Sequence, residues 1–226
     1  MSARAAIEGR VYYQLYLLCP FPFDAHEIEE AQMRRFNFLL FVAVVVGFAA
    51  LAYAGLDDAV SAYEKGDYAR AYEEFKALAL LGNADAQCRL GTQYVEGHGV
   101  PKDYAQALKW YRKAAEQGHA RAQYYLGVMF DTGEGVPQDY GEAIKWYRKA
   151  AEQGLAVAQS NLGAMYGLGQ GVPQDYVQAL MWFKLAASQG YPEAQKGGDL
   201  VANGMTPAQI AEAKRLAAEW KPKSRD

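Results

Sequence analysis

Three glycine pairs come closest to a recognisable chemical motif in this chain of 226 residues. Closely spaced glycines can cradle phosphate where a strand leads into a helix. These pairs recur every 36 residues, follow no strand pattern and lack the Gly-Lys-Ser/Thr ending of a phosphate loop; they are Gly97-x-Gly99, Gly133-x-Gly135 and Gly169-x-Gly171. We therefore interpret them as turn glycines.

Two histidines and a cysteine are the next candidates, as ligands for zinc. The spacing of Cys88, His98 and His119 matches no standard zinc motif. Other copies of the repeat described below place residues such as Glu134 and Leu155 at the histidine positions. We interpret both histidines as solvent-exposed variation and expect no metal and no cofactor. No Ser-His-Asp set departs from the repeat either, so we expect no enzyme.

Charge and cysteine content exclude further classes of protein. Lysine and arginine total 23 against 26 acidic residues, so the net charge of −3 gives no electrostatic footprint for nucleic acid. Cys19 and Cys88 are the only two cysteines, too few for a disulfide framework. The composition favours a globular, helical protein that binds no nucleic acid.

An apolar run over residues 36–54 has the parts of a secretory signal peptide. Arg34 and Arg35 precede it, and it ends in the small-x-small pattern of 52–54. We predict a signal peptide over 33–54, with Met33 as the true start and 1–32 as an upstream over-extension or a disordered tail. The alternative is an uncleaved membrane anchor, since the run is just long enough to span a bilayer. Either way the arginines place everything after Gly55 outside the cytoplasm.

The rest of the chain follows one period. Pro101, Pro137 and Pro173 are each 36 residues apart, and so are the tryptophans at 110, 146 and 182. Residues 101–136 and 137–172 are identical at 23 of 36 positions. Such regularity indicates an array of one supersecondary unit.

Each unit is predicted to be a pair of helices. Ala122, Leu126 and Phe130 share one apolar face, and Gly127 beside them lets a neighbouring helix approach closely. A turn follows, then Asp139, which with Glu142 predicts a capping box. The second helix has the apolar spacing of Ala143, Trp146, Tyr147 and Ala150 and ends at Gly154, a left-handed cap.

The units divide the chain into segments. We predict an N-terminal capping half-repeat over 55–83, followed by three full repeats at 84–119, 120–155 and 156–191. A degenerate repeat and a C-terminal capping helix occupy 192–226. That last helix begins at Thr206-Pro207, with Ile210, Ala213, Leu216 and Trp220 as its buried stripe.

These residues resemble a known family. The pattern runs Ala122-Gln123…Leu126-Gly127…Phe130…Gly133-x-Gly135-Val136-Pro137-x-Asp139-Tyr140…Ala143…Trp146-Tyr147…Ala150-Ala151…Gly154. It is similar to the Sel-one-like repeat (SLR), a relative of the tetratricopeptide repeat. The resemblance implies an all-α, right-handed α-solenoid with terminal capping helices, which binds protein or peptide along its concave face. Some cysteine-rich relatives act on β-lactams, but they carry a cysteine pair in each repeat, which this chain lacks.

Positions that differ between copies are candidates for contact with a partner, because constant positions build the stack. By resemblance to tetratricopeptide stacks, the variable positions of the first helices line the inner groove. The predicted partner-binding residues are Asp85, Cys88, Arg121, Tyr124, Val128, Asp131 and Ser160. Tyrosine and arginine are the types that dominate binding hot spots. The alternative is neutral variation on a solvated surface.

The sequence therefore predicts an exported repeat scaffold, a periplasmic adaptor or regulator that binds another protein or peptide. One alternative keeps the same fold and anchors it to the inner membrane through 36–54. Another is a weak β-lactam hydrolase or a cell-wall binder. For the latter, Trp110, Trp146 and Trp182 could stack on sugars, but their constancy and helical spacing favour packing between helices.

Overall fold

The computed structural model describes residues 55–223, so the tail and signal peptide predicted for 1–54 lie outside the described residues. The described residues belong to the second of two compact units, Ala52–Asp226. Within 55–223 every regular element is a helix, and none of these helices is long and apolar enough to cross a membrane.

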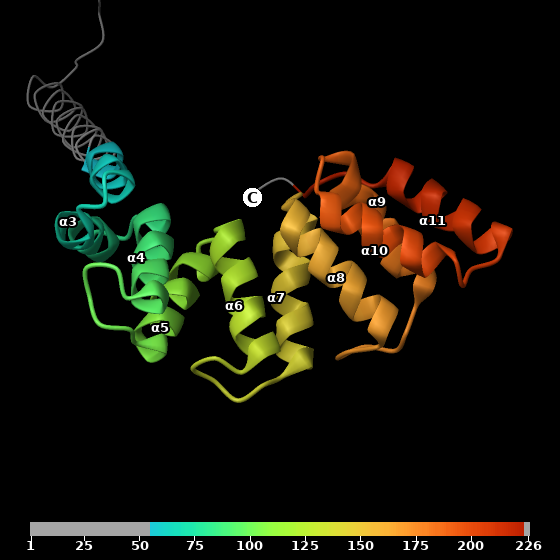
Figure 1. Cartoon of the computed structure of the whole chain (residues 1–226), viewed down its shortest axis with the longest axis horizontal. Coiled ribbons are helices and arrows are strands. Elements are labelled where there is room, and N and C mark those ends of the chain that lie inside the picture. The colour runs from blue at the N-terminus through green and yellow to red at the C-terminus, as the bar shows by residue number, and fades with distance from the viewer. Residues whose placement is uncertain (1–54, 224–226) are drawn as a thin grey trace, which may run out of the picture. The chain divides into compact units, whose positions relative to one another are not determined.

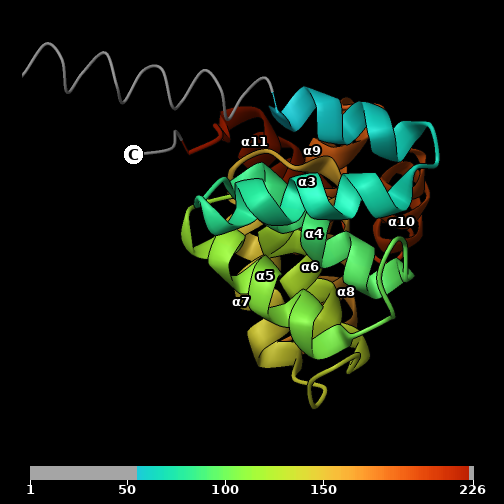
Figure 2. The ribbon, with the colours of Figure 1, turned by 90° about the vertical axis from the view of Figure 1, so that its left-hand side faces the viewer.

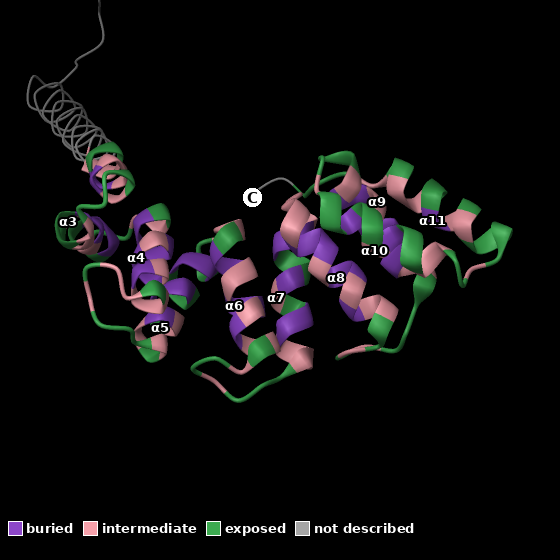
Figure 3. Cartoon of the chain, in the orientation of Figure 1, coloured by how far each residue is buried: buried purple, intermediate pink, exposed green. Residues whose placement is uncertain are grey.

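Helices succeed one another in chain order (Figures 1 and 2). Residues 55–64 are helical, and the helices that follow are α3 (Tyr68–Leu80), α4 (Ala84–Glu96), α5 (Tyr104–Glu116), α6 (Ala120–Thr132), α7 (Tyr140–Glu152), α8 (Ala156–Leu168), α9 (Tyr176–Ser188), α10 (Pro192–Ala202) and α11 (Pro207–Glu219). From α3 to α10 each helix packs against the next, whereas α11 packs against α9. The predicted all-α solenoid of helix pairs is confirmed. Buried residues collect where consecutive helices face each other (Figure 3).

Aspartates begin the second helix of each repeat, as predicted. The side chain of Asp139 accepts a hydrogen bond from the backbone N–H of Glu142 at 3.0 Å, and Asp103 and Asp175 cap α5 and α9 in the same way. The predicted capping box at α7 is wrong. The Glu142 carboxylate instead accepts a hydrogen bond from Lys145 Nζ at 2.6 Å, one turn along the helix.

A glycine on the first helix allows an aromatic ring of the second helix to pack directly on the backbone. A β-carbon at Gly127 would lie 2.5 Å from Cδ1 of Tyr147, closer than carbon atoms can approach. The same relation holds for Gly91 with Tyr111 and, less tightly, for Gly163 with Phe183. The close helix approach predicted at Gly127 is therefore confirmed.

The second glycine of each Gly-x-Gly pair brings a turn against the preceding repeat. Gly171 has a φ of +69°, and a β-carbon there would lie 2.4 Å from the carbonyl oxygen of Tyr140 at the start of α7. Gly99 approaches the carbonyl oxygen of Tyr68 in the same manner, and a β-carbon at Gly135 would lie 2.6 Å from the β-carbon of Tyr104. Backbone conformation and close approach both require glycine here, which accounts for the motif without phosphate.

A ladder of glutamines joins one repeat to the next. The Gln123 amide nitrogen donates to the Ala115 carbonyl oxygen at 3.2 Å, and the Gln123 side-chain oxygen accepts from Gln153 at 2.7 Å. The pairs Gln87–Gln117 and Gln159–Gln189 repeat this arrangement. The buried amides thus satisfy carbonyls at helix ends, where backbone groups lack partners within the helix.

The C-terminal helix caps the array. Thr206 and Gln209 form a reciprocal capping box, with proline at the first helical position as predicted. The rings of Trp220 and Trp182 lie 6.1 Å apart, so the end of α11 covers α9. In the predicted stripe only Ala213 is fully buried, since α11 has a partner on one side alone.

Candidate partner-binding site

A cavity of about 130 Å³ opens where the first two repeats meet. Its lining comes from the helix over 55–64, from α3, α4 and α6, and from the turn before α6. The lining residues are Tyr63, Phe75, Asp85, Cys88, Arg89, Thr92, His119, Arg121 and Tyr125. Aromatic side chains and charged groups therefore share one recess between successive repeats.

The structure brings together three of the predicted partner-binding residues, Asp85, Cys88 and Arg121. Asp85 and Arg121 are exposed at the cavity, whereas Cys88 is buried in its wall.

The other four lie elsewhere. Tyr124 and Val128 pack against the hydrophobic core formed by α7, α8 and α9, and Asp131 accepts a hydrogen bond from the Tyr147 hydroxyl at 3.1 Å. Ser160 is buried on α8. At these four positions the residue type differs between copies, but the side chains take part in packing between helices and do not line the recess.

His119 connects the first two repeats through hydrogen bonds. Its interpretation as solvent-exposed variation is therefore wrong. Its side chain is only 11% exposed. Nδ1 accepts a hydrogen bond from the backbone N–H of Ala122 at 3.1 Å and so caps α6. An accepting Nδ1 leaves the proton on Nε2, which therefore donates to the Asp85 carboxylate at 3.0 Å. His119 thus ties α4 to the start of α6.

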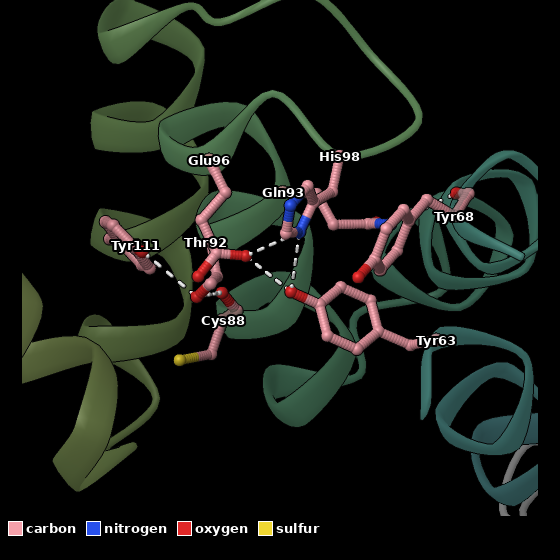
Figure 4. Close-up of polar contacts among 8 residues, drawn as sticks. All are labelled: Tyr63, Tyr68, Cys88, Thr92, Gln93, Glu96, His98 and Tyr111. Atoms are coloured by element: carbon pink, nitrogen blue, oxygen red, sulfur yellow. Dashed lines mark hydrogen bonds and ion pairs between the residues drawn. The ribbon is translucent and has the colours of Figure 1, made fainter. Parts of the chain in front are cut away.

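His98 is likewise part of a contact between elements (Figure 4). Its ring stacks on Tyr68 at a centroid distance of 4.0 Å, and its Nδ1 lies 3.0 Å from the Tyr63 hydroxyl. The Tyr63 hydroxyl also donates to the Glu96 carboxylate. These contacts fasten the first described helix to the end of α4 beside the cavity.

The Cys88 thiol is shielded from reaction. The pKa of this thiol is raised to about 12, chiefly by burial and also by Asp85, while Arg121 and Arg89 act in the opposite direction. Its backbone carbonyl accepts a hydrogen bond from Thr92 Oγ1 at 3.2 Å, and the Thr92 hydroxyl also lies 3.1 Å from that of Tyr111 (Figure 4). A buried, protonated thiol is not a nucleophile.

We expect iodoacetamide to modify Cys88 on the order of a thousandfold more slowly in the folded chain than in urea at pH 8, because only the thiolate reacts. A Cys19→Ser variant leaves Cys88 as the single thiol, and intact mass against time gives both rates. An ordinary thiol, with a pKa of about 8.5, is already partly ionised at this pH. Equal rates in the two states would contradict the assignment.

Sequence reasoning missed several lining residues for identifiable reasons. Arg89 does vary between copies, with Tyr125 and Asn161 at the equivalent positions, so the internal comparison could have found it. Tyr63 and Phe75 belong to the first segment, where no regular copy exists for comparison.

Chemically, the recess is suited to binding. Among residues 55–223 no group of three or more histidine, cysteine or acidic side chains is placed to hold a metal ion. What the recess offers is two guanidinium groups beside aromatic rings, an arrangement that can recognise an anionic group next to an apolar one.

The same repeat is found in known proteins, by sequence and by structure. The sequence model of the Sel1 repeat matches residues 84–119, 120–155 and 156–191. The crystal structure of a Sel1 repeat protein from Oxalobacter formigenes is 34% identical with a TM-score of 0.63, over 73% of this chain and 70% of that one. A protective antigen of uropathogenic Escherichia coli with an SLR fold is 29% identical with a TM-score of 0.54, over 75% of this chain and 45% of that one. No curated protein sequence matches.

Proposed function

The chain belongs to the Sel1 repeat family, and from that premise we propose that it is an exported scaffold that binds a segment of another protein across α4 and α6. Sel1 repeat proteins generally mediate protein–protein interaction, and the family is in general non-catalytic. The observation that carries the proposal is the recess between the first two repeats, where Asp85 and Arg121, which differ between copies, lie exposed together.

Binding to a preformed surface is the mechanism we propose. The side chains around the recess are held by contacts within the array: His119 by Ala122 and Asp85, and Tyr63 by Glu96. A surface already ordered before association loses less conformational entropy when a partner binds. The scaffold therefore acts by equilibrium binding, as an adaptor or a regulator.

The periplasm is the compartment we propose, on the strength of the sequence over 33–54. Its basic start, apolar run and small-residue end support cleavage after Ala54. The intact mass of the chain from periplasmic and membrane fractions tests this. A soluble species beginning at Gly55 agrees with the proposal, whereas a membrane-bound species that keeps 36–54 would make the protein an anchored adaptor.

Partner binding is tested with two double variants of matched charge. Asp85→Ala with Arg121→Ala removes both exposed charges of the recess, whereas Arg112→Ala with Glu116→Ala removes an exposed pair from α5. A partner isolated from periplasmic extract and then purified should bind the first variant about thirtyfold more weakly by calorimetry, the loss typical of a hot spot. The α5 variant should bind normally. Full affinity of the Asp85 and Arg121 variant would reject this face as the binding surface.

A further inference from the structure

Two arginines border the recess without an acidic partner among residues 55–223. Within the described part of the chain neither Arg89 nor Arg121 forms an ion pair, while Arg70, Lys145, Arg215 and Lys223 do. Arg121 is exposed at the cavity, and the half-buried Arg89 lies with its guanidinium carbon 5.8 Å from the centre of the Phe75 ring. Two cations thus border the same small space.

The acidic group nearest to them is already engaged. Asp85 is the only carboxylate among the lining residues, and its Oδ1 accepts a hydrogen bond from His119 Nε2 at 3.0 Å. The Glu96 carboxylate, which does not line the recess, is held by Tyr63 and His98. Among the lining residues two guanidinium groups therefore face one carboxylate, so the recess itself has a positive balance of charge in a chain whose net charge is −3.

The fields of the two arginines overlap inside the cavity. Burial raises the pKa of both Tyr125 and Cys88, and on each group the positive charges of Arg121 and Arg89 act in the opposite direction. Two groups on facing helices, α6 and α4, therefore sense both guanidinium groups. An anion at this point would be attracted by both cations at once.

The size of the cavity restricts what can enter it. At about 130 Å³ it is smaller than the pockets of about 300–1,000 Å³ that hold whole small ligands. The recess suits a single side chain that belongs to a longer segment. The apolar faces of Phe75 and Tyr125 can cover the aliphatic part of such a side chain.

Among the three regular repeats, the pair of arginines beside aromatic rings occurs at one junction only. One repeat later, the positions of Arg89, Thr92 and His119 hold Tyr125, Val128 and Leu155, and that of Arg121 holds Val157. The space that corresponds to Cys88 is taken by Tyr124, whose ring lies 5.8 Å from that of Tyr147. The architecture of the repeat therefore does not require the paired arginines.

We propose that the recess binds an aspartate or glutamate side chain from an internal segment of the partner protein, with its carboxylate between Arg89 and Arg121 and its apolar neighbours against Phe75 and Tyr125. Guanidinium groups match carboxylates in geometry and form charge-assisted hydrogen bonds with them. This inference rests on the proposed function and names the chemistry of the partner at that face.

Two libraries of short peptides test the proposal with the full chain. The peptides are acetylated and amidated, so that no terminus supplies a carboxylate, and the libraries are identical except for glutamate or glutamine at the central position, with apolar residues around it. We expect the glutamate library to yield binders whose glutamine counterparts bind about thirtyfold more weakly, the scale of a hot-spot contact. Fluorescence polarisation of labelled pairs gives the ratio.

Arginine variants then locate the binding. Arg89→Gln and Arg121→Gln should each weaken the glutamate peptide and abolish the preference over glutamine, whereas Arg112→Gln on α5 should change neither. Circular dichroism confirms that the variants are folded, and Arg121→Lys, which keeps the charge, should retain part of the preference.

The failures of the two ideas are distinguishable. Equal binding of glutamate and glutamine peptides, no binding of either, or a preference that survives both arginine variants would overturn the acidic-side-chain proposal alone. A natural partner that the Asp85 and Arg121 variant still binds at full affinity would instead overturn the proposed function.

Discussion

Replacement of Tyr147 by alanine should lower the free energy of unfolding by about 3–5 kcal/mol, the usual cost of deleting a large buried aromatic side chain. Tyr147 is 0% exposed, and its ring fills the space that Gly127 leaves open on α6. The substitution also leaves the Asp131 carboxylate without the hydroxyl that donates to it. Urea unfolding followed by circular dichroism measures the loss.

Two further variants show whether the loss arises from this contact. Tyr176→Ala removes an exposed tyrosine and should change stability by no more than about 0.5 kcal/mol. Gly127→Ala should cost about 1–3 kcal/mol by overpacking in the native chain and much less in the Tyr147→Ala chain, where the ring is gone. A Tyr147→Ala loss below about 1 kcal/mol, or additive effects of the two substitutions, would contradict the packing described.

The period of the sequence was sufficient to predict the helices, because the same apolar spacing and the same turn residues recur in each copy. Asp139 and Gly127 could be assigned roles for this reason. The glutamine ladder could not be predicted, although the Ala-Gln pair is constant. A repeated residue shows that a position matters, but its hydrogen-bond partners depend on the packing of the helices: for Gln123, Gln153 lies 30 residues along in the same repeat, and Ala115 lies in the preceding repeat.

The candidate site was less predictable than the fold. Variation between copies singled out Arg121 and Tyr124 alike, yet Arg121 lies exposed at the recess and Tyr124 packs on the hydrophobic core formed by α7, α8 and α9. Variable positions can either face a partner or pack between helices, because a large residue in one repeat can fill space that a small one leaves in another. The cavity itself depends on Phe75, which lies outside the regular copies.

The turn glycines have two roles, which experiment can separate: they adopt a left-handed backbone conformation, and some of them also allow a turn to approach the preceding repeat closely. Gly171 and Gly118 both have positive φ, +69° and +82°, but a β-carbon at Gly118 would meet nothing within 4 Å, whereas one at Gly171 would strike the backbone of Tyr140. Gly118→Ala should therefore cost only the strain of the left-handed conformation, about 1–2 kcal/mol.

Gly171→Ala should cost about 2–5 kcal/mol, because the clash adds about 1–3 kcal/mol to the same strain. The obstacle is the carbonyl oxygen of Tyr140, 2.4 Å away, and no change of side-chain rotamer can remove it. The turn after α8 must therefore move away from α7, which separates two repeats. Urea unfolding of both variants gives the comparison. Equal losses would mean that the glycines serve backbone conformation alone and that the contact between turn and helix does not hold the repeats together.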